Sequence, residues 1–211
     1  MAEPALADFP ISARRARTRD RLLTAAVAVF AERGVNGASV EEICDAASFT
    51  RGAFYSNFAD KSDLVLALLD RSMTVQFSAA QQAVADMKAA TDASAEEMIT
   101  LALTAFERAG RPFREGILLD QELRLHAARE PALHAAYLNF VHECDRQMAA
   151  LIVDALAHLG LELTVPFEHA LRLLAAVHDH EQRLAVFEGQ PADATVMRSL
   201  LLAITRPAPE K

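Results

Sequence analysis

The sequence predicts an all-α fold of about nine helices. Apolar residues recur at the three- and four-residue spacing of a helix along almost the whole chain, and no alternating run of β-branched residues occurs. Glycines and prolines lie between these periodic segments. The predicted helices cover the approximate ranges 18–33, 40–47, 51–58, 61–87, 94–106, 113–129, 131–160, 166–188 and 191–205. We expect the two ends, about 1–13 and 206–211, to be mobile.

Composition places the chain among soluble globular proteins. Its 211 residues suit one domain, or two small domains that share a core. No apolar run approaches the roughly 20 residues needed to span a bilayer, and the first residues lack the pattern of a secretory signal. Cys44 and Cys144 fall in different helical segments and make no disulfide framework. We therefore expect a cytoplasmic protein with no membrane contact.

The negative net charge is unevenly distributed. The whole chain carries −8, but residues 1–61 hold eight basic and eight acidic residues, so the excess of acid lies beyond residue 61. Five arginines also crowd into positions 14–21 against one aspartate. Binding to phosphates requires a basic surface only locally. The arginine cluster could therefore contact DNA, or it could be a solvated arm.

Two short helices joined by a tight turn, 40–47 and 51–58, predict a helix-turn-helix. Ser39 and Glu42 have the spacing of a capping box at the first of them. The start of the second helix would enter the major groove, where Arg51 could pair with a guanine. Small residues there would let the backbone approach DNA, and flanking polar residues could bind phosphates. The candidate DNA-binding residues are Ser39, Thr50, Arg51, Gly52, Ala53, Tyr55, Asn57 and Lys61.

The stretch 18–69 resembles the DNA-binding region of the TetR family. The shared motifs are F-A-E-R-G at 30–34, S-V-x-x-I at 39–43, T-R-G-A-F-Y-x-x-F at 50–58 and D-K-x-x-L at 60–64. The resemblance implies that Tyr55 and Lys61 bind phosphates, and that Thr50 and Arg51 lie in the groove. Two positions depart from the common pattern: Ser48 replaces the usual glycine of the turn, and Asn57 replaces a frequent histidine.

The resemblance also implies the organisation of the remaining chain. It predicts a DNA-binding domain at 14–60 and a ligand-binding and dimerisation domain at 61–206, with a homodimer formed by the last two helices. An unknown small-molecule effector would bind among helices four to seven. The candidate ligand-binding residues are Phe106, Phe113, Ile117, Glu122, His126, Phe140, Cys144 and Met148, of which the apolar ones could equally be plain core.

The leading hypothesis is therefore a sequence-specific repressor, released from double-stranded operator DNA by its effector. The alternative is a DNA-binding regulator without a small-molecule ligand. An enzyme is not expected, because the sequence lacks a glycine-rich phosphate loop, a nucleophile elbow and an H-E-x-x-H pair. No cofactor is expected either. The cluster at 178–181 (His-Asp-His-Glu) is more consistent with a polar surface than with a metal site, because successive helical residues point in different directions.

Overall fold

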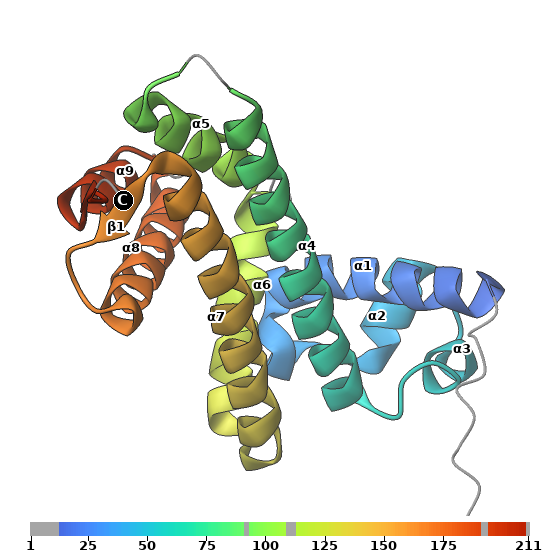
Figure 1. The fold of residues 1–211 in the computed structure, drawn as a ribbon. Coiled ribbons are helices and arrows are strands. Elements are labelled where there is room, and N and C mark those ends of the chain that lie inside the picture. Colours follow the sequence, from blue (N-terminus) through green and yellow to red (C-terminus); the bar gives the residue numbers. More distant parts are fainter. Residues whose placement is uncertain (1–12, 91–92, 109–112, 191–193, 210–211) are drawn as a thin grey trace, which may run out of the picture.

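The computed structural model describes the chain except for residues 1–12, 91–92, 109–112, 191–193 and 210–211. The regular elements of the described part are α1 Ala13–Gly37, α2 Val40–Ala47, α3 Arg51–Tyr55, α4 Lys61–Ala89, α5 Ala95–Arg108, α6 Phe113–Arg129, α7 Pro131–Leu159, β1 Leu161–Leu163, α8 Phe167–Glu188, α9 Ala194–Ala203 and β2 Thr205–Pro207 (Figure 1). The all-α prediction is confirmed, with one short strand pair added. Among the described helices, none is both long and apolar enough to cross a bilayer.

The first three helices form a unit at one end of the molecule, and α4 runs from this unit into the larger bundle of α5 to α9 (Figure 1). The centre of the unit is aromatic. Phe30, Phe54 and Phe58 are at most 1% exposed. The same apolar cluster continues into the C-terminal helices through Leu119, Leu123, Ala127 and Leu133. The N-terminal unit is therefore packed firmly against α6 and the start of α7.

Helix starts follow the local sequence closely. The Ser39 hydroxyl accepts the N–H of Glu42 (3.2 Å), and the Glu42 carboxylate accepts the N–H of Ser39 (2.8 Å). Ser94 and Glu97 repeat this arrangement before α5, at 3.3 and 2.8 Å. Hydrogen bonds from the serine backbone and hydroxyl hold the pKa of both glutamates below its usual value. Both predicted capping boxes are confirmed, and each satisfies amides that a helix start leaves open.

Two helix boundaries differ from the prediction. Helix α1 begins at Ala13, five residues before the predicted start. Its added first turns are rich in alanine and arginine, which are good helix formers. Helix α3 ends at Tyr55 rather than near Phe58. There the side-chain amide of Asn57 donates to the carbonyl of Ala53 (2.8 Å), a local bond of the kind that competes with a continuing helix.

Helix α1 bends sharply at Gly34. The sequence predicts that the helix ends there, whereas helical residues resume after the bend and reach Gly37. Gly34 has φ 70° and ψ 162°, a region almost restricted to glycine. The next N–H, of Val35, donates to a carboxylate oxygen of Glu122 on α6 (3.1 Å). A Cβ at Gly34 would lie 2.7 Å from that oxygen, so both the backbone and the contact require glycine.

The C-terminal end of the chain is paired rather than free. Strands β1 and β2 run antiparallel, with Leu161 opposite Pro207. Arg206 of β2 also pairs with Glu162 of β1 (2.7 Å). The prediction of a mobile end from residue 206 is thus wrong for Arg206 and Pro207. Three-residue strands are too short to show a detectable alternation, which is why the sequence gives no sign of them.

Candidate nucleic-acid interface

Helices α2 and α3 are joined by a turn whose left-handed residue is a serine. Ser48 has φ 56° and ψ 46°, and it caps α2 by donating its N–H to the carbonyl of Asp45 (3.0 Å). The N–H of Phe49 donates to the carbonyl of Cys44 (2.8 Å). The turn therefore keeps its geometry without the usual glycine, at the cost of placing a side chain where L-residues are disfavoured.

Replacing Ser48 with glycine should stabilise the protein by about 0.5–1 kcal/mol. The left-handed penalty of a non-glycine residue, about 1–2 kcal/mol, disappears, and the greater unfolded-state freedom of glycine offsets part of the gain. Guanidinium denaturation would measure the change. Ser56→Gly is the matched control, because Ser56 ends α3 in a right-handed conformation and donates to Ala53 (2.9 Å), so it should destabilise. A Ser48→Gly protein no more stable than the parent would show that the left-handed conformation of Ser48 does not strain the native state.

The first turn of α3 is exposed to solvent. The Thr50 hydroxyl accepts the N–H of Ala53 (3.2 Å) and so caps the helix. Arg51 and Gly52 are exposed and Ala53 is half-buried. A Cβ at Gly52 would meet nothing closer than 3.7 Å, so the fold itself does not need glycine there. The small residues leave this turn open to a close-fitting partner.

Tyr55 and Arg51 share the outer face of α3 and meet Glu41 of α2. The Tyr55 side chain is 50% exposed, while its neighbour Phe54 is fully buried and packs edge-on against it (5.3 Å between ring centres). The guanidinium carbon of Arg51 lies 5.9 Å from the centre of the Tyr55 ring. The same guanidinium is 2.7 Å from the carboxylate of Glu41. Helix α3 thus buries one aromatic and presents the other beside a cation.

Three further candidates are bonded within the chain. Ser39 belongs to the capping box of α2. Asn57 is 8% exposed and its amide nitrogen is bonded within the end of α3. The ammonium group of Lys61 donates to the carbonyls of Val35 (2.7 Å) and Ala38 (3.0 Å). These contacts hold the turn after α1 and the ends of the short helices, and a role of the three residues toward DNA stays a prediction.

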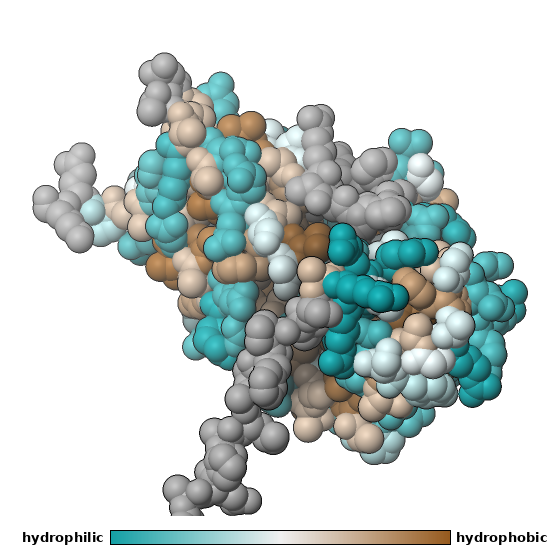
Figure 2. Space-filling model, turned by 90° about the vertical axis from the view of Figure 1, so that its right-hand side faces the viewer, coloured by the Kyte–Doolittle hydropathy of each residue, from teal (hydrophilic) through white to brown (hydrophobic). Residues whose placement is uncertain are grey.

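Two arginines of the 14–21 cluster support the helix-turn-helix from α1. Arg19 donates to the carbonyl of Asn57 (2.9 Å) and Arg21 to that of Ala47 (2.8 Å), at the ends of α3 and α2. Each guanidinium also lies over a phenylalanine ring, at 4.3 and 4.6 Å from its centre. The other members of the cluster are exposed: Arg14, Arg15 and Arg17. Figure 2 views the molecule from this side, where hydrophilic side chains gather.

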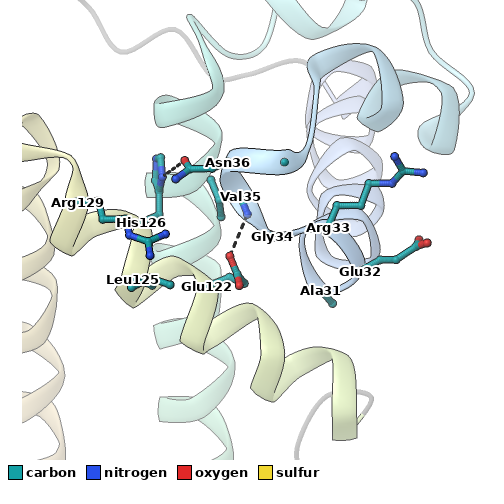
Figure 3. A pocket seen from close by; sticks show the side chains of 11 residues that line it. Ala31, Glu32, Arg33, Gly34, Val35, Asn36, Glu122, Leu125, His126 and Arg129 are labelled. Atoms are coloured by element: carbon teal, nitrogen blue, oxygen red, sulfur yellow. Dashed lines mark hydrogen bonds between the residues drawn. The ribbon is translucent and has the colours of Figure 1, made fainter.

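Glu122 and His126, predicted as ligand-binding residues, lie at the joint between α1 and α6 (Figure 3). The Glu122 carboxylate reaches Val35 at the bend, and Nδ1 of His126 lies 2.9 Å from the Oδ1 of Asn36. His126 is 6% exposed, and its burial lowers its pKa. The joint borders a hollow of about 350 Å³. Both side chains therefore connect the N-terminal unit to the helical bundle.

Three other ligand candidates lie on α7. Phe140 contributes to a hollow of about 270 Å³ between α4 and α7, together with Met73 and Glu143. Cys144 is half-buried, and burial raises its pKa to about 11. Its thiol is therefore protonated and unreactive near neutral pH. Met148 is half-buried one turn further on.

The remaining candidates lie on α5 and α6. Ile117 is 8% exposed. Phe106 packs against the ring of His178 on α8, with 5.5 Å between ring centres. Phe113 begins α6, but its side chain lies outside the described residues. The predicted ligand residues thus fall into separate groups: Glu122 and His126 border one of these two hollows, and Phe140 borders the other.

An ion-pair network between α6 and α8 was not predicted. Arg124 lies 2.9 Å from Asp120 and 2.7 Å from Asp179, and Arg183 also pairs with Asp179 (2.7 Å). Both helices carry an aspartate and an arginine four residues apart, which is the one signal visible in the sequence. Their union across two helices depends on the fold. No group of three His, Cys, Asp or Glu side chains that could hold a metal ion occurs among the described residues.

Comparison with known proteins identifies the N-terminal unit. The family model described as bacterial regulatory proteins, tetR family, matches residues 22–68, which contain α2, α3 and their turn. Residues 22–68 therefore match the DNA-binding part of the TetR family. This family consists of transcriptional regulators and not of enzymes.

Relatives extend the likeness unevenly along the chain. The repressor BepR of Brucella suis is 45% identical over 60 residues, which is 28% of this chain and 29% of that protein. The first relatives in order of similarity are matched over less than a third of their own length. Salmonella enterica GusR has the same fold over 89% of this chain and 94% of its own (TM-score 0.66, 24% identity). Bacillus subtilis FadR, solved with stearoyl-CoA, covers 88% and 97% (TM-score 0.65, 19% identity).

Proposed function

We propose that this TetR-family protein is a dimeric, cytoplasmic repressor that binds double-stranded operator DNA through α3. The observation that carries the proposal is the exposed first turn of α3. Thr50, Arg51 and Gly52 face solvent there, while Phe54 anchors the helix in the core. A rigid helix with exposed side chains at its N-terminal end suits reading of base edges in the major groove. The domain division at 14–60 and 61–206 belongs to the same proposal.

Selection of bound duplexes from a random DNA pool tests the DNA-binding step. The parent should enrich a palindrome with half-sites about one helical turn apart. The double variant Arg51→Ala/Tyr55→Phe removes a candidate base contact and a candidate phosphate contact. It should bind the selected site about 10- to 100-fold more weakly.

Arg206→Ala is the matched control. Arg206 is also an exposed arginine paired with a glutamate at 2.7 Å, but it lies in strand β2 near the C-terminal end. It should bind the selected site as the parent does. A folded parent that enriches no site at low salt would overturn the proposal, and equal loss in the control would show that Arg51 and Tyr55 have no special role.

Exposed apolar side chains on the last two helices support a homodimer. Their exposed fractions are far above those of a covered core: Leu173 42%, Leu184 40%, Phe187 88%, Val196 48% and Leu202 40%. Several exposed apolar side chains on two neighbouring helices are typical of an interface. Two-fold pairing of α8 and α9 would present two copies of α3 to a palindromic operator.

An effector pocket is proposed within α4 to α7. Phe140 already borders the hollow between α4 and α7, and the helices would have to move apart for Phe106, Ile117 and Met148 to line the same pocket. FadR, which shares the fold, was solved with stearoyl-CoA, so this architecture can hold a ligand in at least one protein. Glu122 and His126 would then transmit a shift of α6 to the bend of α1, because both are bonded to that bend.

The alternative is a regulator without a small-molecule ligand. The ion pairs of Arg124 with Asp120 and Asp179 favour it, because they link α6 directly to α8 and satisfy charges that a ligand would otherwise meet. Thermal-shift screening separates the two hypotheses. A ligand that binds the native state raises the melting temperature, and the rise grows with the logarithm of the ligand concentration above Kd. Release of the operator by the same compound would support the effector.

A further inference from the structure

The exposed arginine of α3 is already paired with a carboxylate of α2. The Nη1 of Arg51 lies 2.7 Å from an Oε1 of Glu41, across the turn that joins the two helices. The two side chains are 61% and 51% exposed. In water such an exposed pair contributes little to stability, about 0–1 kcal/mol. Such a pair has a larger effect when another charged surface approaches and water is excluded from around it.

Glu41 is not needed to start α2. Its neighbour Glu42 makes the capping box with Ser39 and pairs with Arg33 (2.6 Å). Glu41 makes neither of those contacts and points outward to α3 instead. An acidic residue in a first turn does gain a small benefit from the helix dipole. That benefit explains the charge of Glu41, but it does not explain the contact with Arg51.

The guanidinium of Arg51 is held from two sides. Tyr55 hydrogen-bonds it and Glu41 attracts it, and together they raise the pKa of Arg51 above its ordinary value. One of its five N–H groups faces the carboxylate. The N–H groups that neither Glu41 nor Tyr55 engages are left for an acceptor in front of α3. A planar guanidinium that is held in one orientation can match the two acceptors of a guanine edge.

We propose that Glu41 is a specificity-determining residue, which keeps Arg51 oriented for a base edge and opposes its use as a general phosphate contact. This inference rests on the proposed function. On a cognate site Arg51 reaches its base while still paired with Glu41. On unrelated DNA it would have to leave Glu41 to meet a phosphate, and the exposed carboxylate would then face the negative backbone unpaired. Binding to random sequence is thereby weakened more than binding to the operator.

Glu41→Gln tests the inference on the full-length protein, because it removes the charge and keeps the size. Affinities for the selected operator and for a random duplex are measured over a series of salt concentrations. Random-duplex binding should tighten about 3- to 10-fold, and its logarithmic salt slope should steepen by about 0.9, the value of one added phosphate contact. On the operator, the lost orientation of Arg51 offsets the lost repulsion of the backbone, so affinity there should change less than about threefold and the specificity ratio falls.

Glu162→Gln is the matched control. Glu162 pairs with Arg206 at the same distance of 2.7 Å, far along the chain from α3, and its variant should bind as the parent does. An unchanged ratio and salt slope in Glu41→Gln would overturn the inference and leave the proposed function intact. Equal weakening on both duplexes would make Glu41 merely structural, which also overturns it. A parent that selects no operator overturns the proposed function itself, and the inference with it.

Discussion

Replacing Phe187 with aspartate should convert the proposed dimer into monomers and weaken operator binding by at least about 100-fold. Phe187 is 88% exposed in the single chain, on α8. Burial of one such side chain is worth about 1.5–3 kcal/mol, and a two-fold interface uses it twice. Aspartate removes that gain and places two charges at the interface. Sedimentation velocity would give the oligomeric state, and titration with the selected duplex the affinity.

Leu138→Asp is the control for this prediction. Leu138 is 54% exposed, but it lies on α7, outside the last two helices. Its variant should remain a dimer and bind the operator as the parent does. A Phe187→Asp protein that stays dimeric would mean that the subunits associate through another face.

Replacing Gly34 with alanine should lower the free energy of unfolding by roughly 2–4 kcal/mol. The φ and ψ of Gly34 lie in a region where other residues are strained by about 1–3 kcal/mol. The new Cβ would also lie 2.7 Å from Glu122 and displace its carboxylate from the N–H of Val35. A hydrogen bond to a charged group contributes about 1.5–3 kcal/mol. A melting temperature lower by about 5–15 °C would be the visible result.

Gly160→Ala separates backbone strain from the contact with Glu122. Gly160 also has a positive φ, 64°, but a Cβ there would meet nothing within 4 Å. It should cost only about 1 kcal/mol. In a Glu122→Ala background, Gly34→Ala should lose the part of its effect that comes from the collision. If both glycine replacements lower the free energy of unfolding equally, and Glu122→Ala leaves the effect of Gly34→Ala unchanged, then the contact of Glu122 with the bend does not stabilise the protein.

The helix pattern was predictable because its signals are local. Ser39 with Glu42, and Ser94 with Glu97, predict helix starts from a spacing of three residues, and both capping boxes are present. The pair of strands β1 and β2 was not predictable, because each strand has only three residues and the paired residues are more than forty positions apart in the sequence. The bend at Gly34 was predicted only as a helix end. Glu122, which accepts the N–H of Val35 after the bend, lies 87 positions further along the chain.

The sequence predicts which helix forms the candidate site, but not which partners its charged side chains contact. The sequence identifies α3 and its exposed start, because the apolar spacing of Phe54 and Phe58 leaves Tyr55 on the other face. It cannot reveal that Lys61 is bonded to the turn after α1, or that Arg19 and Arg21 support the short helices. A cationic side chain has the same pattern in sequence whether it meets a carbonyl or a phosphate. Its partner is decided by the packing of distant helices.

The bend of α1 and the turn that follows it are held by α4 and α6. Lys61, at the start of α4, binds carbonyls of this segment, and Glu122 and His126 of α6 bind its other polar groups. A chimeric regulator joined at residues 60 and 61 would take α1 from one parent and α6 from the other. Its first three helices would then pack against an α6 from the other parent. Exchange of effector domains among such proteins therefore requires that the matching face of α6 be transplanted together with the DNA-binding unit.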